Sequence, residues 1–187
     1  MAHVLKLDVA GMPERWISPE AAASLYATGS IAWTLGEPWT TLRGGYNRLL
    51  ARRTLMPLHP IIAVKGKWNN PRAHVAVPPL TRRSLIRRDR SLCAYCGLLF
   101  DESDLTTDHI MPVSRGGGHA WTNVLAACRR CNHGKSDRTP EEWGHLPLFV
   151  AYAPNRYEGL ILANRRVLAD QLQFLLAGVP RSSRLVQ

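Results

Sequence analysis

The stretch TTDHIMPVSRGGGHAWTNVLAACRRCNHGKS, residues 106–136, gathers side chains that bind metals and move protons. Asp108 and His109 are adjacent, Asn123 follows fourteen residues after the histidine, and Asn132 comes directly after a cysteine. In a strand, Asp108 and His109 point to opposite sides. One of them can therefore hold a metal ion while the other reaches a water molecule beside it.

The four cysteines form a single pattern. They fall into two Cys-x2-Cys pairs, Cys93 with Cys96 and Cys128 with Cys131, with 31 residues between the pairs. Two such knuckles are typical of a tetrahedral zinc site. The alternative, two disulfides, requires an oxidising compartment. Four thiolates leave no open coordination position, so we predict a structural Zn²⁺ that does not react.

The residues between and after the cysteine pairs predict a ββα unit. Residues 105–112 and 123–128 fit two strands joined by a glycine turn at 114–118, and residues 129–136 fit a helix that starts at the second pair. His119, just after the glycine turn, is expected to be a loop residue. The zinc ion would then clamp the base of the unit.

Helix spacing selects among the polar residues of 129–136. Asn132, Lys135 and Ser136 share a face, whereas His133 is turned about 100° away. Asn132 is thus better placed than His133 to complete a metal site with Asp108. The sequence CNH leaves His133 as the alternative ligand.

Charge predicts the partner. The chain has 24 Lys and Arg against 14 Asp and Glu, a net charge of +10. Twelve of the basic residues lie between Arg43 and Arg90, with Asp89 as the only acid among them. Such a block favours a surface that binds nucleic acid, because Arg and Lys contacts to phosphate supply the sequence-independent part of the affinity. A solvated face or an acidic protein partner is the alternative, and Tyr46 and Trp68 are the aromatic residues that could stack on a base.

Other segments indicate a mixed fold. Residues 4–9 and 30–36 fit strands, residues 81–90 fit a basic helix, and Ser18 fits the N-cap of a helix that begins at Pro19. A C-terminal packing helix is expected to present one leucine face, made of Leu168, Leu172, Leu175 and Leu176. The chain has no apolar run of about 20 residues and no secretory signal at its N-terminus. A cytoplasmic location without membrane contact is therefore expected.

The ordered motifs resemble a known family. RRDRSLCAYCG, DHIMPVSRGGG, an isolated Asn, CRRCN and a Lys follow one another across residues 82–143, as in the HNH (ββα-metal) endonucleases whose third signature residue is Asn. Similar motifs occur in restriction nucleases that cut modified DNA, in phage nucleases and in RNA-guided nucleases.

The resemblance implies a role for each site residue. His109 would be the general base that takes a proton from the attacking water. Asp108 and Asn132 would hold one Mg²⁺ or Mn²⁺ on the scissile phosphate, and Asn123 would brace the loop and orient His109. The remaining residues are expected to contact DNA: Lys135, Arg115, Arg82, Arg83, Arg87 and Arg88.

The predicted fold is α+β, with a zinc-clamped ββα core, an N-terminal β-rich basic extension and a C-terminal helix. The expected parts are residues 1–80 as the possible DNA-binding extension, 81–145 as the HNH nuclease domain and 146–187 as the helical segment. The predicted activity is hydrolysis of phosphodiester bonds in DNA, expected to be double-stranded, by nicking or by double-strand cleavage through a homodimer or two separate nicks. Two alternatives stay open: a zinc-stabilised nucleic-acid-binding module without catalysis, and a nuclease specific for branched or modified DNA.

Overall fold

The computed structural model describes residues 2–49, 51–66 and 77–186, and it divides the chain into two compact units. The first unit comprises residues 1–76 and 164–178, and the second comprises 77–163 and 179–187. The predicted C-terminal segment, 146–187, is thus shared between the two units. Trp68, predicted to stack on a base, lies outside the described residues.

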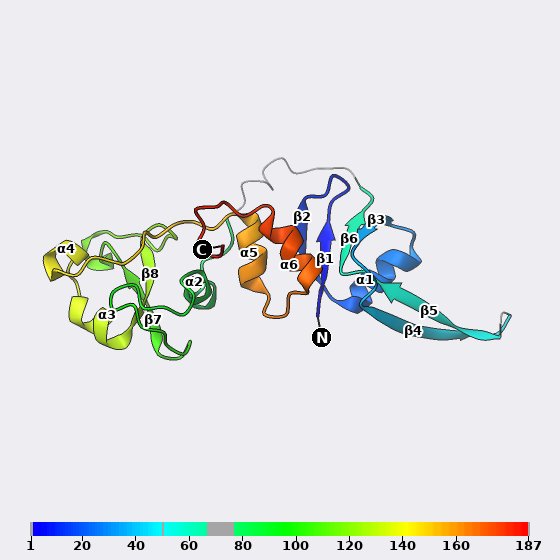
Figure 1. The fold of residues 1–187 in the computed structure, drawn as a ribbon, viewed down its shortest axis with the longest axis horizontal. Coiled ribbons are helices and arrows are strands. Elements are labelled where there is room, and N and C mark those ends of the chain that lie inside the picture. The colour runs from blue at the N-terminus through cyan, green and yellow to red at the C-terminus, as the bar shows by residue number, and fades with distance from the viewer. Residues whose placement is uncertain (1, 50, 67–76, 187) are drawn as a thin grey trace. The chain divides into compact units, whose positions relative to one another are not determined.

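The first unit is built on a four-stranded sheet in the order β2-β1-β6-β3 (Figure 1). Strand β1 (Val4–Leu7) is antiparallel to β2 (Pro13–Ile17) and parallel to β6 (Ile61–Val64), which is antiparallel to β3 (Ile31–Leu35). Helix α1 (Pro19–Ala27) buries Ala22 against Val4 and Ile62 of this sheet. The Ser18 hydroxyl accepts a hydrogen bond from the Ala21 N–H, which confirms the predicted N-cap.

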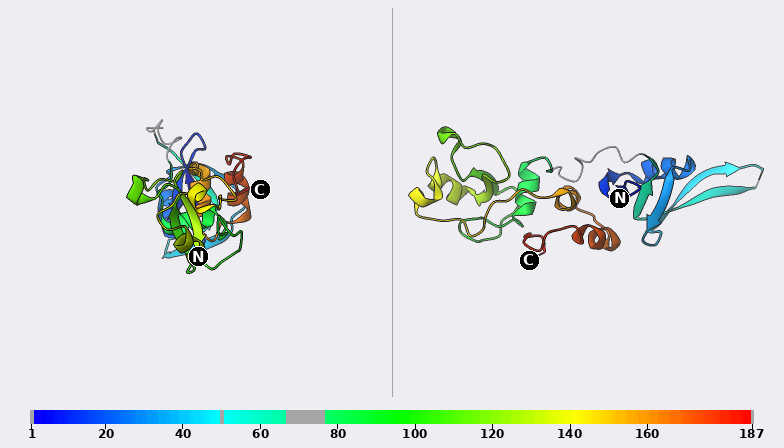
Figure 2. Two further views of the ribbon diagram at one scale, coloured as in Figure 1. Left: turned by 90° about the vertical axis from the view of Figure 1, so that its left-hand side faces the viewer. Right: turned by 90° about the horizontal axis from the view of Figure 1, so that it is seen from above.

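Two further elements complete this unit. Strands β4 (Thr40–Asn47) and β5 (Arg52–Leu58) pair only with each other in an antiparallel hairpin, which extends beyond the sheet in Figure 1 and in the right-hand view of Figure 2. Helix α6 (Ala169–Leu176) buries Leu175 and also Gln171, whose amide donates to the His3 and Pro60 carbonyls. The predicted leucine face is corrected here: Leu172 is exposed, because Gln171 makes the buried contact to the sheet.

The second unit holds the predicted ββα core. Strands β7 (Leu105–His109) and β8 (Val124–Cys128) form an antiparallel hairpin, and helix α3 (Arg129–Lys135) begins directly after β8. Helix α2 (Arg82–Arg88) packs on both strands, and the short turn η2 (Val113–Arg115) lies between them in the chain. Helices α4 (Pro140–Trp143) and α5 (Arg156–Ala163) follow. This arrangement confirms the predicted α+β fold class.

The buried side chain of Arg88 connects helix α2 to the β7–β8 hairpin. The Arg88 side chain is fully buried and donates to the Asp89 carboxylate and to the carbonyls of Trp121, Val124 and Tyr152. Asp89 in turn accepts from the Ala126 N–H at 2.8 Å. A buried charge requires such partners, since an unpaired one would cost several kcal/mol. The prediction that Arg88 contacts DNA was wrong, because its guanidinium holds the core together.

Among the described residues, no helix has the length and apolar character needed to cross a membrane.

Candidate active site

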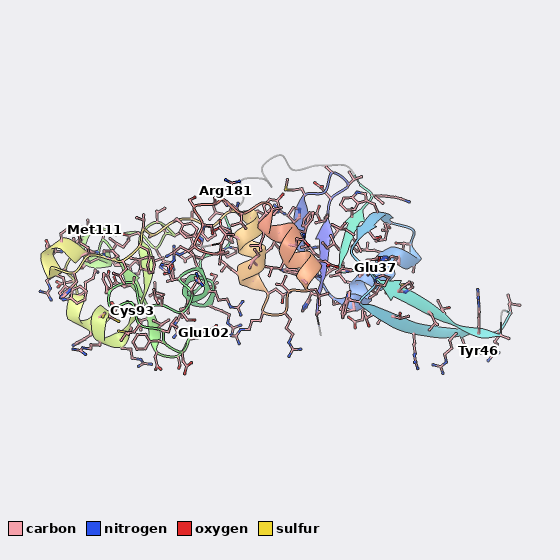
Figure 3. All side chains as sticks on the ribbon, viewed as in Figure 1. Glu37, Tyr46, Cys93, Glu102, Met111 and Arg181 are labelled. Carbon is pink, nitrogen blue, oxygen red and sulfur yellow. The ribbon has the colours of Figure 1, made fainter. Side chains whose placement is uncertain are left out.

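The four cysteines meet at the base of the ββα unit, near the position of Cys93 in Figure 3. Their sulfur atoms all lie within 4.8 Å of one another, close to the roughly 3.8 Å expected around a zinc ion with 2.3 Å bonds. Burial raises the pKa of the Cys93 thiol, but N–H groups of Cys96 and Cys128 outweigh it and lower that pKa to about 7. The donor set thus fits a four-thiolate Zn²⁺.

His109 is the last residue of β7, and its imidazole is half-buried beside a second histidine. The Nε2 atom of His109 lies 3.2 Å from Nδ1 of His119. Burial lowers the pKa of His109, the electrostatic interaction with the His119 ring lowers it further, and Asp108 opposes both. The imidazole of His109 is therefore neutral near pH 7 and able to accept a proton.

His119 was expected to be only a loop residue. The loop after β7 returns to the end of that strand, which brings two residues ten positions apart into ring contact at a centroid distance of 5.3 Å. The sequence carries no spacing signal for this contact, because the path of the glycine-rich loop decides it.

Asp108 points to the opposite side of β7 and is only 3% exposed. One of its carboxylate oxygens lies 3.0 Å from the Lys135 ammonium, and the other accepts from the Tyr95 hydroxyl. Lys135 is fully buried and donates also to the His109 carbonyl at 2.6 Å. The prediction that Lys135 contacts phosphate was wrong, because this ammonium faces the interior.

Asn132 occupies a different environment from Asp108. Its amide Nδ2 donates to Thr106 Oγ1 at 2.8 Å, and it lines an open cleft of about 410 Å³. The other residues of this cleft are Thr106, Arg129, His133 and Ser136. His133 therefore faces the same cleft as Asn132, whereas the Asp108 carboxylate is enclosed by Lys135 and Tyr95.

This arrangement bears on the predicted Mg²⁺ or Mn²⁺. Both oxygens of Asp108 already have partners, the Tyr95 hydroxyl on one and the Lys135 ammonium on the other. Asp108 and Asn132 therefore do not form an open cation site with Lys135 in this position.

Asn123 holds the loop between the two strands. Its Oδ1 accepts from the Met111 N–H, and its Nδ2 donates to the carbonyls of Met111 and Gly118. Gly117 lies against the same segment, where an added Cβ would stand 1.8 Å from the Met111 carbonyl oxygen. Only glycine fits there, so Asn123 and Gly117 together fix the loop that carries His119.

The remaining predicted DNA contacts differ in availability. Arg115 forms a two-pronged hydrogen bond to both oxygens of Glu142, at 2.6 and 2.7 Å. Arg82 donates to the Leu105 carbonyl, and Arg87 donates to a carbonyl of α5. Arg83 is the most open of the set, with 68% of its side chain exposed.

A β-hairpin, a braced loop and a helix form a ββα unit around the four cysteines, and its first strand ends on Asp-His. Residues 93–146 match the family model of the HNH endonucleases. No curated protein matches the chain. The match supports a nuclease activity, the hydrolysis of phosphodiester bonds in nucleic acid, for the domain that contains residues 93–146.

Proposed function

We propose that this protein is a DNA endonuclease in which His109 is the general base. The observation that carries the proposal is the position of this imidazole, which lies half-buried at the end of β7, 3.2 Å from His119, within the region that matches the HNH endonucleases. Neutral imidazole accepts a proton from water, and positioned proton transfer contributes roughly 10²- to 10⁴-fold to a rate.

Contacts with neighbouring groups position His109 for the proton transfer. Water attacks the phosphorus atom while His109 removes its proton, and the phosphodiester bond breaks to leave 5'-phosphate and 3'-hydroxyl ends. The ring of His119, with Nδ1 3.2 Å from Nε2 of His109, holds the imidazole of His109 in position. The Lys135 ammonium on the His109 carbonyl holds the backbone of the base in position.

The proposed reaction also requires ligands for a catalytic divalent cation. Mg²⁺ or Mn²⁺ on the family pattern would stabilise negative charge at the phosphate. Asp108 can serve it only if a divalent ion displaces the ammonium of Lys135. Asn132 and His133 both face the adjacent cleft and are the further candidate ligands.

The same ion pair favours a second candidate function. A domain whose carboxylate is permanently neutralised by Lys135 would keep the zinc-stabilised fold and bind nucleic acid without cutting it. The two candidates make opposite predictions for one assay.

Cleavage of supercoiled plasmid tests the proposal, with wild type, His109→Ala and the exposed-histidine control His3→Ala, each in Mg²⁺, Mn²⁺ or EDTA. Metal-dependent nicking that only His109→Ala loses supports the endonuclease, provided that all three proteins carry equal zinc. The ratio of nicked to linear product measures whether one or both strands are cut. A wild type that shifts the plasmid in a gel but leaves it intact supports the binding module.

Substrate arms separate the remaining alternatives. Linear duplex, a four-way junction and duplex containing modified cytosine are incubated in parallel with the same enzyme. Cleavage confined to the junction or to the modified duplex would assign the corresponding specificity, and equal cleavage of all three would exclude both.

A further inference from the structure

The hairpin β4–β5 is the most basic element of the first unit. Residues 40–58 contain four arginines and no acidic residue. The four are exposed: Arg43, Arg48, Arg52 and Arg53. A ribbon with this charge balance repels itself, so it is complementary to a polyanion.

The register of the hairpin places charge and apolar surface on one face. Tyr46 lies opposite Arg53, and Arg43 lies opposite Leu55. Opposite residues share a face, and so do residues two apart in one strand, such as Arg53 and Leu55. The register shift between Arg43 and Tyr46 keeps both on that face. The result is a mixed face of two arginines, a tyrosine and a leucine.

This face is open to solvent within the described structure. Tyr46 is 59% and Leu55 61% exposed, and Leu49 near the tip is 96% exposed. Figure 3 shows Tyr46 at the far end of the hairpin, away from the four-stranded sheet. Isolated two-stranded ribbons are marginal in water, so exposed apolar groups at this position indicate a contact surface rather than part of a core.

The dimensions of the hairpin match the major groove of double-stranded DNA. Strand β4 has eight residues, which span roughly 26 Å at about 3.3 Å per residue. The major groove of B-form DNA is about 12 Å wide and admits a two-stranded ribbon, with phosphates along its edges and thymine methyl groups on its floor. Arginine side chains can contact the phosphates along the edges of the groove, and tyrosine and leucine side chains can contact the thymine methyl groups on its floor.

We propose that the β4–β5 hairpin binds double-stranded DNA by entering its major groove. The face with Tyr46 and Leu55 lies toward the base edges, while the tip arginines Arg48 and Arg52 contact phosphates. The inference rests on the proposed function in taking DNA as the substrate, and it assigns duplex recognition to the first unit rather than to the nuclease domain.

The test measures binding apart from cleavage. In the His109→Ala background, all four hairpin arginines are replaced by glutamine. A matched control carries the same charge change at exposed arginines elsewhere, namely Arg15, Arg165, Arg166 and Arg181. Anisotropy of a labelled 25-base-pair duplex gives the affinity over a series of salt concentrations. Zinc content and thermal unfolding show that each variant is folded.

Loss of the two phosphate contacts of Arg48 and Arg52 should reduce the slope of log K against log salt by about 2, since each contributes roughly 0.9. Affinity should fall at least about tenfold below that of the control. Dimethyl sulfate should find guanine N7 protected by the unmodified hairpin and open in the variant, because N7 lies in the major groove. If the fourfold variant does not fold, Arg48→Gln alone should reduce the slope by about 1.

Equal slopes for hairpin variant and control would overturn the proposal. So would equal binding of duplex RNA, whose major groove is too narrow for side chains to read; that outcome would point to an RNA partner. Failure of the nuclease proposal is distinguishable, because the binding assay uses protein that is not required to cut. The same hairpin substitutions in protein that retains His109 should still nick plasmid at high protein concentration, which would leave the nuclease intact and place the loss in duplex binding.

Discussion

The buried pair of Lys135 and Asp108 makes a strong prediction about stability and about the cation. Replacing Lys135 by Met keeps most of the apolar stem but removes the charge. Asp108, 3% exposed, would then keep the Tyr95 hydroxyl as its hydrogen-bond partner on the other oxygen. Breaking a buried pair from one side costs about 3 to 5 kcal/mol.

A double variant separates the charge effect from packing. Lys135→Met with Asp108→Leu removes both charges, and such replacements are often near neutral. The Tyr95 hydroxyl would lose its acceptor and the His109 carbonyl would lose the Lys135 donor, each at about 1 to 3 kcal/mol. Arg115→Met, which breaks the more exposed pair with Glu142 in the same unit, is the matched control and should cost about 1 kcal/mol or less.

The assay is zinc release during urea unfolding, which reports on the unit that holds the four cysteines. Adding Mg²⁺ to the same assay tests whether Asp108 can bind a divalent ion. If a divalent ion can take the place of the ammonium, Mg²⁺ at 100 times its dissociation constant should stabilise Lys135→Met by about 2.7 kcal/mol. The double variant, which lacks the carboxylate, should gain nothing.

Two results would refute the reasoning. A loss below about 1 kcal/mol in Lys135→Met would show that the pair is not buried and paired as the structure has it. A stabilisation by Mg²⁺ that is equal in the single and double variants would show that Asp108 is not the ligand.

Three further predictions concern other residues of the second unit. Arg88→Lys should destabilise the second unit by about 3 kcal/mol or more in the same zinc-release assay, since lysine cannot reproduce the planar set of donors. The control Arg83→Lys should change the stability of the unit by less than about 0.5 kcal/mol. Similar losses in both variants would contradict the buried network. Gly117→Ala should lower the rate of plasmid nicking about tenfold or more with zinc retained, because its Cβ would collide with the Met111 carbonyl, and Gly118→Ala, which meets nothing within 4 Å, should be neutral. His119→Gln removes the electrostatic interaction of the second ring, so the pKa of His109 should rise toward its ordinary value and the acidic limb of kcat/KM against pH should move to higher pH. An unmoved limb would show that the two rings are not coupled.

The lowered pKa of His109 also fixes the sign of its effect on stability. The folded state binds this proton less well than the unfolded state does, so the histidine contributes no penalty above the unfolded pKa of roughly 6.5. As pH falls below that value, the unfolded chain gains the proton first and the free energy of unfolding decreases.

Local spacing determined much of this protein. The two Cys-x2-Cys pairs, the adjacent Asp108 and His109, and the helix cap at Ser18 are all features of neighbouring residues, and the zinc cluster and the ββα order followed from them. The resemblance read from these motifs was confirmed by the family match over residues 93–146.

Tertiary structure decided which charges are available. Arg88 and Lys135 lie in basic stretches that predict a surface, yet both are fully buried, because Asp89 and Asp108 compensate them in the core. Asp108 is 27 residues from Lys135 in the chain, so no local pattern reveals the pairing. For the same reason, leucine spacing alone could not predict the buried face of the C-terminal helix, because Gln171 on that face contacts His3, 168 residues away in the chain. Sequence periodicity reports which residues could be buried, whereas only the folded chain shows which polar groups find a partner there.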